Sequence, residues 1–223
     1  MEKQRLENVY GGYRHSRPKA ESWKDSPAKG LTWKQVFSLI ERETDSYPKK
    51  KRSLRILEVG SYAGNILYRM SALFPDARLY GLDIRQDPLR QGRKNLPGVH
   101  FVCGDGADLP FAAGTFDIVI QFVCLSSVLD VNIRKSICRE MFDVLRPGGT
   151  LISLDMRYWS PNENVVSIGR TELKQNFRGA SAVSFFPVWL LPPLQRRVAN
   201  PWLLKMLYAL SLLRSHWLCF IRK

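Results

Sequence analysis

Residues 54–65 join a short apolar run to a glycine-bearing turn and read Leu54-Arg55-Ile56-Leu57-Glu58-Val59-Gly60-Ser61-Tyr62-Ala63-Gly64-Asn65. The run up to Val59 predicts a buried strand, and the spacing of apolar residues after the turn predicts a helix from Asn65 to about Phe74. A strand, a turn and a helix in this order are typical of βαβ units, which build a parallel sheet.

The same alternation continues outward from this stretch. Further strands are predicted at 77–82, 99–103, 116–122 and 150–154, with helices at 87–96 and 131–145. A weaker tail predicts a helix at 171–177, a strand at 182–186, an apolar helical stretch at 189–213 and a strand at 217–221. The sequence therefore predicts an α/β fold whose sheet is mostly parallel and has helices on both faces.

Three regions are expected along the chain. Residues 1–50 are predicted to form an N-terminal arm, polar and without a sustained period up to residue 30, followed by a helix over Thr32–Thr44. Together these two segments are expected to act as a lid or cap. Residues 51–156 are predicted to form the ligand-binding core, and residues 157–223 to complete the sheet and cover it with apolar helix.

The charge distribution points to an anionic partner. The chain has 34 Lys and Arg against 20 Asp and Glu, a formal net charge of +14. The excess lies in the flanks, with +7 in residues 1–55, −1 in 56–155 and +8 in 156–223. The run Lys49-Lys50-Lys51-Arg52 fits a solvated loop at least as well as a phosphate contact.

The cysteines and the apolar runs limit the protein class. Cys103, Cys124, Cys138 and Cys219 lie far apart in the sequence, so we expect neither a metal site nor a disulfide framework. The sequence begins without a signal-peptide core, and no apolar run reaches the length that spans a bilayer. We therefore expect a cytoplasmic protein with reduced thiols.

Polar residues lie at or just beyond the carboxyl ends of the first four predicted strands. They are Glu58, Asp83, Asp105 and Gln121. Each alone is better explained as a helix cap or a loop residue. In an open parallel sheet, however, ligands bind outside the carboxyl ends of the strands. The four residues in order therefore predict a binding site at this edge.

The residue types at this edge indicate a nucleoside ligand with a cationic part. Gly60 and Gly64 are four residues apart, which departs from the dinucleotide fingerprint and disfavours an NAD-dependent oxidoreductase. An acid two residues before Gly60 suits a cation better than a pyrophosphate. Asp83 has the position and the chemistry to accept both hydroxyls of a ribose. Asp105 with Gly106-Ala107 is suited to read the edge of an adenine.

Successive motifs resemble those of class I S-adenosylmethionine-dependent methyltransferases of the small-molecule type. They are Leu57-Glu58-Val59-Gly60 with Gly64, Gly81-Leu82-Asp83, Cys103-Gly104-Asp105-Gly106-Ala107-Asp108-Leu109-Pro110-Phe111, Phe116-Asp117-Ile118-Val119 and Leu145-Arg146-Pro147-Gly148-Gly149. The resemblance covers residues 54–155 and implies a Rossmann-like, seven-stranded, mostly parallel sheet. The segment Gln121–Asp130 and the C-terminal end also resemble a bacterial group of these enzymes whose substrates are mostly unassigned.

The resemblance implies a role for each site residue. Glu58 would lie near the methionine ammonium of S-adenosylmethionine, and the backbone of Gly60 and Ser61 would line the methionine part, with Gln121 beside it. Asp83 would hold the ribose, Ile84 would pack on the adenine, and Asp105, Gly106 and Ala107 would contact its edge. The family commonly has glycine at the position of Tyr62, so this side chain must point away from the cofactor or alter its pocket.

The expected reaction is transfer of a methyl group to a small-molecule or glycan-like acceptor, with oxygen as the expected methylated atom. An alcohol acceptor benefits from a positioned base, for which His15 in the arm and Asp130 after the fourth strand are the candidates. Two alternatives are an RNA methyltransferase that uses the basic flanks and a non-catalytic binding module in which Tyr62 blocks the cofactor.

The segment Trp202–Leu213 is apolar on most of its circumference. One interpretation is a helix that covers the core or closes the acceptor pocket, because helices that are apolar all round are usually buried. The other is a helix on a membrane surface, assisted by Arg196, Arg197, Lys205 and Arg214. The second interpretation suits an anionic or lipid-linked saccharide acceptor.

Overall fold

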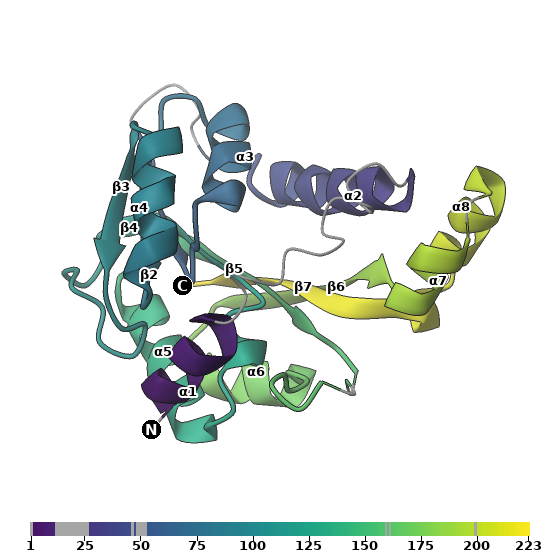
Figure 1. Cartoon of the computed structure of the whole chain (residues 1–223). Coiled ribbons are helices and arrows are strands. Elements are labelled where there is room, and N and C mark those ends of the chain that lie inside the picture. Colours follow the sequence, from purple (N-terminus) through teal and green to yellow (C-terminus); the bar gives the residue numbers. More distant parts are fainter. Residues whose placement is uncertain are drawn as a thin grey trace.

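The computed structural model describes residues 2–11, 27–45, 47, 53–158, 160, 162–198 and 200–223. Its centre is one sheet of seven strands in the order β3-β2-β1-β4-β5-β7-β6 (Figure 1). The strands are β1 (Arg55–Val59), β2 (Arg78–Asp83), β3 (Val99–Cys103), β4 (Phe116–Phe122), β5 (Leu145–Met156), β6 (Ala182–Leu190) and β7 (Arg214–Arg222). Only β7 pairs antiparallel with its neighbours, β5 and β6. The predicted seven-stranded, mostly parallel sheet is confirmed.

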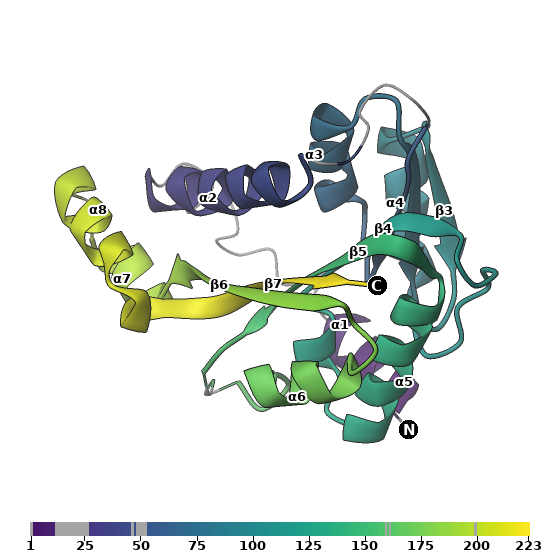
Figure 2. The same ribbon diagram turned by 180° about the vertical axis from the view of Figure 1, so that it is seen from behind.

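Helices cover both faces of the sheet (Figures 1 and 2). One face carries α2 (Pro27–Glu43), α3 (Asn65–Leu73) and α4 (Gln86–Asn95), and the other carries α5 (Val131–Asp143) and α6 (Arg170–Asn176). Each face has its own apolar core, around Ile40, Leu67 and Ile118 on the first and around Ile137, Met141 and Leu173 on the second. Central strand β4 is buried from Phe116 to Gln121, because helices lie on both of its faces.

The structure corrects the prediction for the N-terminal arm. Residues 2–11 are the helix α1 (Glu2–Gly11), although the sequence shows no sustained apolar period there. The second helix begins at Pro27, where proline suits a first helical turn, and not at Thr32. The remaining residues of the arm, 12–26, include His15 and lie outside the described residues.

The segment around Pro147 is part of a strand and not the stop of a helix. Helix α5 ends at Asp143, and β5 begins at Leu145 and runs through Pro147, Gly148 and Gly149. Gly148 has φ +72°, and the pairing with β4 shifts register between Phe116 and Ile118. A β-bulge therefore takes up the residues that the sequence suggests as a helix end.

The apolar stretch predicted as one helix over 189–213 is broken into several elements. Strand β6 extends to Leu190, and α7 (Pro192–Arg197), α8 (Pro201–Ala209) and the 3₁₀ helix η3 (Ser211–Leu213) follow. Pro192 and Pro201 lie in the first turns of α7 and α8, and the Asn200 side chain caps α8 by accepting from the amides of Trp202 and Leu203. The apolar period alone does not reveal these breaks.

Candidate cofactor site

A cavity of about 210 Å³ lies at the carboxyl ends of the first four strands. It spans the point between β1 and β4 where the strand order reverses, which is where open α/β sheets bind ligands. Its lining residues come from the strand ends, the loop after β4, and helices α1 and α5: Leu6, Val59, Gly60, Tyr62, Leu82, Asp83, Ile84, Arg85, Asp105, Gly106, Phe122, Val123, Cys124, Ser127, Val128, Ile133 and Ile137. Five of the ten predicted cofactor residues line this cavity: Gly60, Asp83, Ile84, Asp105 and Gly106. The lining does not include the other five, which are Glu58, Ser61, Gly64, Ala107 and Gln121.

The turn after β1 is shaped by two glycines with positive φ. Gly60 has φ +76°, and a Cβ atom there would lie 2.9 Å from both the Cβ and the Sγ of Cys124. Gly64 has φ +80°, and a Cβ there would lie 2.7 Å from the Phe101 ring. These glycines therefore let the turn approach the loop after β4 and let α3 approach β3.

Asp83 is a nearly buried carboxylate in the wall of the cavity. Its Oδ2 accepts from the backbone N–H of Tyr62 at 2.8 Å, and its Oδ1 accepts from the backbone N–H of Arg85 at 2.9 Å. The Arg85 guanidinium lies 3.7 Å from the same Oδ1. Each carboxylate oxygen keeps a further lone pair, because a carboxylate accepts about four hydrogen bonds in all.

Tyr62 lies at the rim of the cavity with φ +51°, a backbone conformation that favours glycine. Its ring is about half exposed and lies 5.2 Å from the Arg85 guanidinium carbon. Its backbone amide holds Asp83. The side chain therefore forms part of the rim of the cavity.

The loop after β3 satisfies part of its own hydrogen bonding. Asp105 Oδ1 accepts from the Ala107 amide at 2.9 Å, so this amide is already engaged inside the loop. A Cβ at Gly106 would lie 3.1 Å from Val59, so glycine permits this close packing. Asp105 and Gly106 line the cavity, whereas Ala107 is not among the lining residues and its amide braces the loop.

Glu58 and Ser61 are almost completely buried, each with 3% of its surface exposed. Among the described residues, Glu58 Oε2 and Ser61 Oγ have no hydrogen-bond partner. Burial, with a smaller contribution from the nearby Asp83 charge, raises the pKa of Glu58 well above its ordinary value. A buried carboxylate oxygen without a partner is costly, and a cationic group at this position would relieve that cost.

Gln121 does not line the cavity. It is fully buried, its Nε2 donates to Ser153 Oγ and Asp155 Oδ2, and its Oε1 accepts from the amides of Cys124 and Leu125. Its hydrogen-bonding groups are thus engaged inside the protein. The structure places Gln121 beneath the loop after β4 and outside the cavity lining, and its expected place beside the methionine part stays a prediction.

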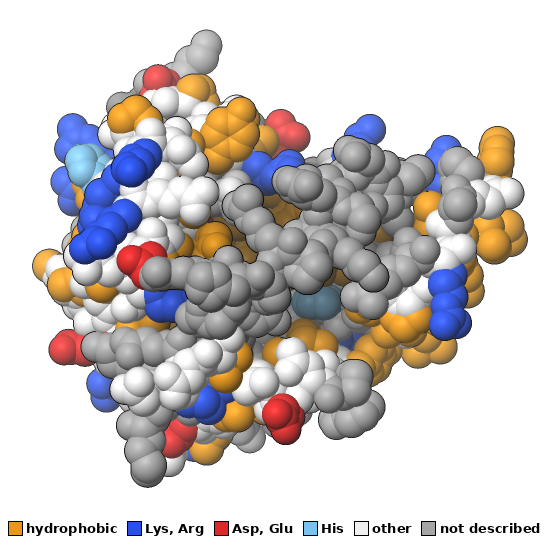
Figure 3. Space-filling model, viewed as in Figure 1, with side chains coloured by type: hydrophobic (Ala, Val, Ile, Leu, Met, Phe, Trp, Pro, Cys, Tyr) orange, Lys and Arg blue, Asp and Glu red, His pale blue; other side chains and the backbone are white. Residues whose placement is uncertain are grey.

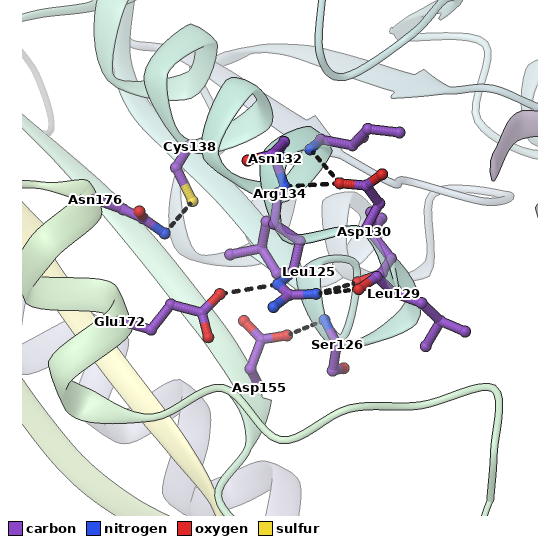
Figure 4. Close-up of polar contacts among 12 residues, drawn as sticks. Leu125, Ser126, Leu129, Asp130, Asn132, Arg134, Cys138, Asp155, Glu172 and Asn176 are labelled. Atoms are coloured by element: carbon purple, nitrogen blue, oxygen red, sulfur yellow. Dashed lines mark hydrogen bonds and ion pairs between the residues drawn. The ribbon is translucent and has the colours of Figure 1, made fainter.

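The loop after β4 contains a strained residue that the sequence did not reveal. Val123 has φ +59°, which is a rare conformation for a β-branched residue. Asp155 holds the following turn by accepting from the Ser126 amide at 3.0 Å (Figure 4). Burial raises the pKa of Asp155 to about 6, although its hydrogen bonds oppose the shift.

A buried arginine, also not foreseen, braces the end of the same loop (Figure 4). Arg134 Nη1 donates to the carbonyl oxygens of Val128 and Leu129, each at 2.8 Å, and its Nε lies 2.8 Å from Glu172 Oε1. Asp130, a candidate base, caps α5 here by accepting from the amides of Asn132 at 2.7 Å and Ile133 at 3.3 Å. Asp130 is not among the residues that line the cavity.

Helix α1 closes one side of the cavity. Leu6 is part of the lining, and Arg5 donates to the carbonyl oxygen of Ser127 at 2.5 Å and to Asn164 Oδ1 at 3.4 Å. This helix is therefore tied to the loop after β4.

Comparisons with known proteins agree with this geometry. Residues 56–149 match the protein family described as a methyltransferase domain. An O-methyltransferase, cnsE, of Penicillium expansum is 29% identical over 157 residues, which cover 68% of this chain and 54% of that protein. A phthiotriol/phenolphthiotriol dimycocerosates methyltransferase of Mycobacterium leprae is 39% identical over 114 residues, covering 46% and 38%. The chain thus spans about half the length, or less, of these relatives.

Solved structures share the fold. The 1,6-didemethyltoxoflavin-N1-methyltransferase of Burkholderia thailandensis, solved with bound 1,6-didemethyltoxoflavin and S-adenosylhomocysteine, superimposes with a TM-score of 0.62 at 13% identity. The superposition covers 99% of this chain and 87% of that one. The strand order, the strand-end cavity and the family match together identify residues 56–149 as a methyltransferase domain of the class I S-adenosylmethionine-dependent type.

Proposed function

We propose that the protein transfers the methyl group of S-adenosylmethionine to a hydroxyl group of a small-molecule acceptor. The observation that carries this proposal is the buried Oε2 of Glu58, which has no hydrogen-bond partner among the described residues and whose residue directly precedes Val59 of the cavity lining. A carboxylate in that state suits a ligand that brings its own positive charge. Asp83, also nearly buried, retains acceptor capacity suited to vicinal hydroxyls.

The cavity residues fit the parts of this cofactor. Asp83 would hold the ribose hydroxyls, and Asp105 with Gly106 the edge of the adenine, whose faces would meet Ile84 and Ile137. Glu58, buried directly before the lining residue Val59, would hold the methionine ammonium. Gln121 has a positioning role, because it fixes the amides of the loop at Cys124 and Leu125. The cofactor supplies a methyl group already activated by the sulfonium, so the protein has to align the acceptor and exclude water.

We place the acceptor against an aromatic cluster next to the cavity. Phe122, which lines the cavity, stacks on Trp33 of α2 with ring centroids 6.3 Å apart. Trp33 meets the edge of Trp189 at 5.2 Å, and Trp189 lies 4.4 Å from the His216 ring. Trp189 has φ +56°, and its buried Nε1 has no hydrogen-bond partner among the described residues. The cluster thus offers flat apolar surface and one donor.

His216 is our candidate for the proton acceptor. His216 pairs with Met156 at the carboxyl end of β5. Its side chain lies on the same face of the sheet as Phe122, because Phe122 pairs with Leu154, Leu154 pairs with Leu218, and Leu218 is two residues from His216 on β7. Ser215 Oγ lies 3.0 Å from the Trp189 carbonyl oxygen and 2.8 Å from His216 Nδ1. If Ser215 donates its single proton to the carbonyl, Nδ1–H donates to Ser215, and Nε2 keeps a free lone pair.

Methyl transfer to a hydroxyl group also requires an acceptor for the hydroxyl proton. When bound, the cofactor would supply its methyl group to the acceptor oxygen, and His216 Nε2 would take up the hydroxyl proton. Burial lowers the pKa of His216 to about 4, so the imidazole is neutral at pH 7. The proton acceptor that we propose thus lies on β7, whereas the sequence suggested His15 or Asp130.

The test uses ¹³C-methyl-labelled S-adenosylmethionine with 2-naphthol and its saturated counterpart decahydro-2-naphthol, two hydroxyl compounds of similar size. We expect labelled ether from 2-naphthol in preference to the saturated alcohol. His216→Asn should lower kcat at least about tenfold while the affinity for S-adenosylhomocysteine is kept. Label on carbon would contradict oxygen transfer, and full turnover by His216→Asn would remove its role.

A further inference from the structure

The elements α7, α8 and η3 connect β6 to β7 and stand out from the sheet at its β6 edge (Figures 1 and 2). One side of α8 packs against the body of the protein. Leu204 is fully buried beside Leu190, and Leu207 is partly buried with them. The Tyr208 hydroxyl is hydrogen-bonded to Thr32 Oγ1 of α2. These contacts attach the projection to the sheet and to α2.

The opposite side of the projection is apolar and exposed. Trp202, Met206 and Leu212 have 77%, 70% and 74% of their surfaces exposed, and Leu203 and Leu210 have about half. Of the eight exposed large apolar side chains in the described part of the chain, these are five, within eleven consecutive residues. The expectation that this helix covers the core therefore holds for one side of α8 only. A continuous apolar face of this kind marks a surface that meets another phase or molecule.

The positive charge of the projection favours an anionic partner. Residues 192–213, which hold α7, α8 and η3, contain three Lys and Arg and no Asp or Glu. Arg197 ends α7 with its side chain exposed, and Lys205 Nζ lies 5.4 Å from the Trp202 ring. Figure 3 shows blue side chains next to the orange ones on this projection. A second copy of the same face would bring positive charge against positive charge, whereas anionic lipid headgroups would neutralise it.

We propose that α8 and η3 form a docking surface for an anionic lipid bilayer. Trp202, Met206 and Leu212 enter the boundary between headgroups and acyl chains, and Lys205 and Arg197 contact the phosphates. The helix lies on the bilayer: among the described residues, none of the helices is long and apolar enough to cross one. This surface is separate from the cofactor cavity, so the inference stands or falls independently of the proposed methyl transfer.

The test is cosedimentation of the full chain with vesicles of phosphatidylcholine alone or mixed with phosphatidylglycerol. We expect binding to the mixed vesicles, weaker binding to phosphatidylcholine alone, and a decrease as salt is added. The double variant Trp202→Ser, Met206→Ser should partition at least about tenfold less. Lys205→Gln should partition about fivefold less, the effect of one cation near an anionic surface.

Tyr68→Ser is the matched control, because Tyr68 is an exposed aromatic residue on α3, with 65% of its surface accessible. It should bind vesicles like the wild type. The substituted side chains are exposed, so thermal unfolding should show that all variants fold. Absence of wild-type binding, or equal binding by the double variant, would overturn the proposal. A wild-type dimer that the double variant converts to monomer would assign the face to a second copy instead.

Discussion

Glu58 shows how a single buried residue can reveal a binding site. Its carboxylate is held away from water next to Asp83, and one oxygen has no partner among the described residues. Evolution rarely keeps such a group for stability, because an unpaired buried charge destabilises the fold. Tyr62 and Val123, which both have positive φ, line the cavity together with Val59, the residue after Glu58. Unfavourable burial and backbone strain that occur close together are typical of a functional site.

Replacing Glu58 by glutamine should affect stability and binding in opposite directions. Without cofactor, Glu58→Gln should leave the free energy of unfolding at pH 7 unchanged or raise it by about 1–2 kcal/mol, since no charge is buried. Affinity for S-adenosylmethionine should fall about tenfold or more. Urea unfolding and calorimetric titration measure the two quantities. The control is Glu41→Gln on the exposed side of α2, which should change neither. Unchanged affinity in Glu58→Gln would contradict the ammonium assignment.

The left-handed backbone of Tyr62 predicts a difference between two substitutions. Tyr62→Ala removes the ring and keeps a side chain at φ +51°, whereas Tyr62→Gly removes both. The glycine variant should be more stable than the alanine variant by about 1 kcal/mol, the usual cost of this conformation for a non-glycine residue. Thermal unfolding compares them. An alanine variant as stable as the glycine variant would show that the turn carries no strain.

Asp155 predicts a pH dependence of stability. Its pKa is about 6 in the folded protein, above the ordinary value of 3.8, so the folded state binds the proton more tightly than the unfolded chain does. The contribution of Asp155 to stability therefore falls as pH rises from about 4 to 6, by up to about 3 kcal/mol. Urea unfolding of the wild type and Asp155→Asn across this range isolates the effect. A difference between the two proteins that does not vary with pH would contradict the raised pKa.

At the scale of elements, the apolar pattern of the sequence predicted the central strands and helices well, and the N-terminal helix and the β-bulge poorly. Strand β4 and the helix that begins at Asn65 have clear apolar patterns of their own, and both lie where the sequence predicts. Helix α1 has no such period and owes its place to Arg5 and Leu6 against the loop after β4. Tertiary contacts of this kind override weak local preferences. The bulge around Gly148 was missed because Pro-Gly-Gly also resembles a helix stop.

The attachment of α1 can be tested at Arg5. Arg5→Ala removes the hydrogen bond to the Ser127 carbonyl, so α1 should close the cavity less often. Affinity for S-adenosylhomocysteine should fall about fivefold, the value of one hydrogen bond near 1 kcal/mol. Gln4→Ala is the control, because Gln4 is exposed and hydrogen-bonds to its own helix at Asn8. If both variants bind like the wild type, α1 is not part of the site.

At the scale of the whole molecule, the parallel sheet brings residues that are far apart in the sequence to one edge. Asp83 and Asp105 meet at the cavity because parallel strands end at the same edge, which made this part of the site predictable. Arg134, Trp189 and His216 were not predictable. Arg134 acts through the backbone carbonyls of Val128 and Leu129, which no residue pattern indicates, and β7, which carries His216, lies beside β5 only because it inserts antiparallel between β5 and β6.

Calorimetric titration with S-adenosylhomocysteine tests the central claim, that the strand-end cavity binds this cofactor, most directly. Wild-type protein should bind one equivalent, and Asp83→Ala, shown to be folded by its thermal transition, should bind about 10- to 100-fold more weakly through loss of hydrogen bonds to a charged group. NADH should give no heat of binding. Absence of binding by the folded wild type, or equal affinity in Asp83→Ala, would contradict the account.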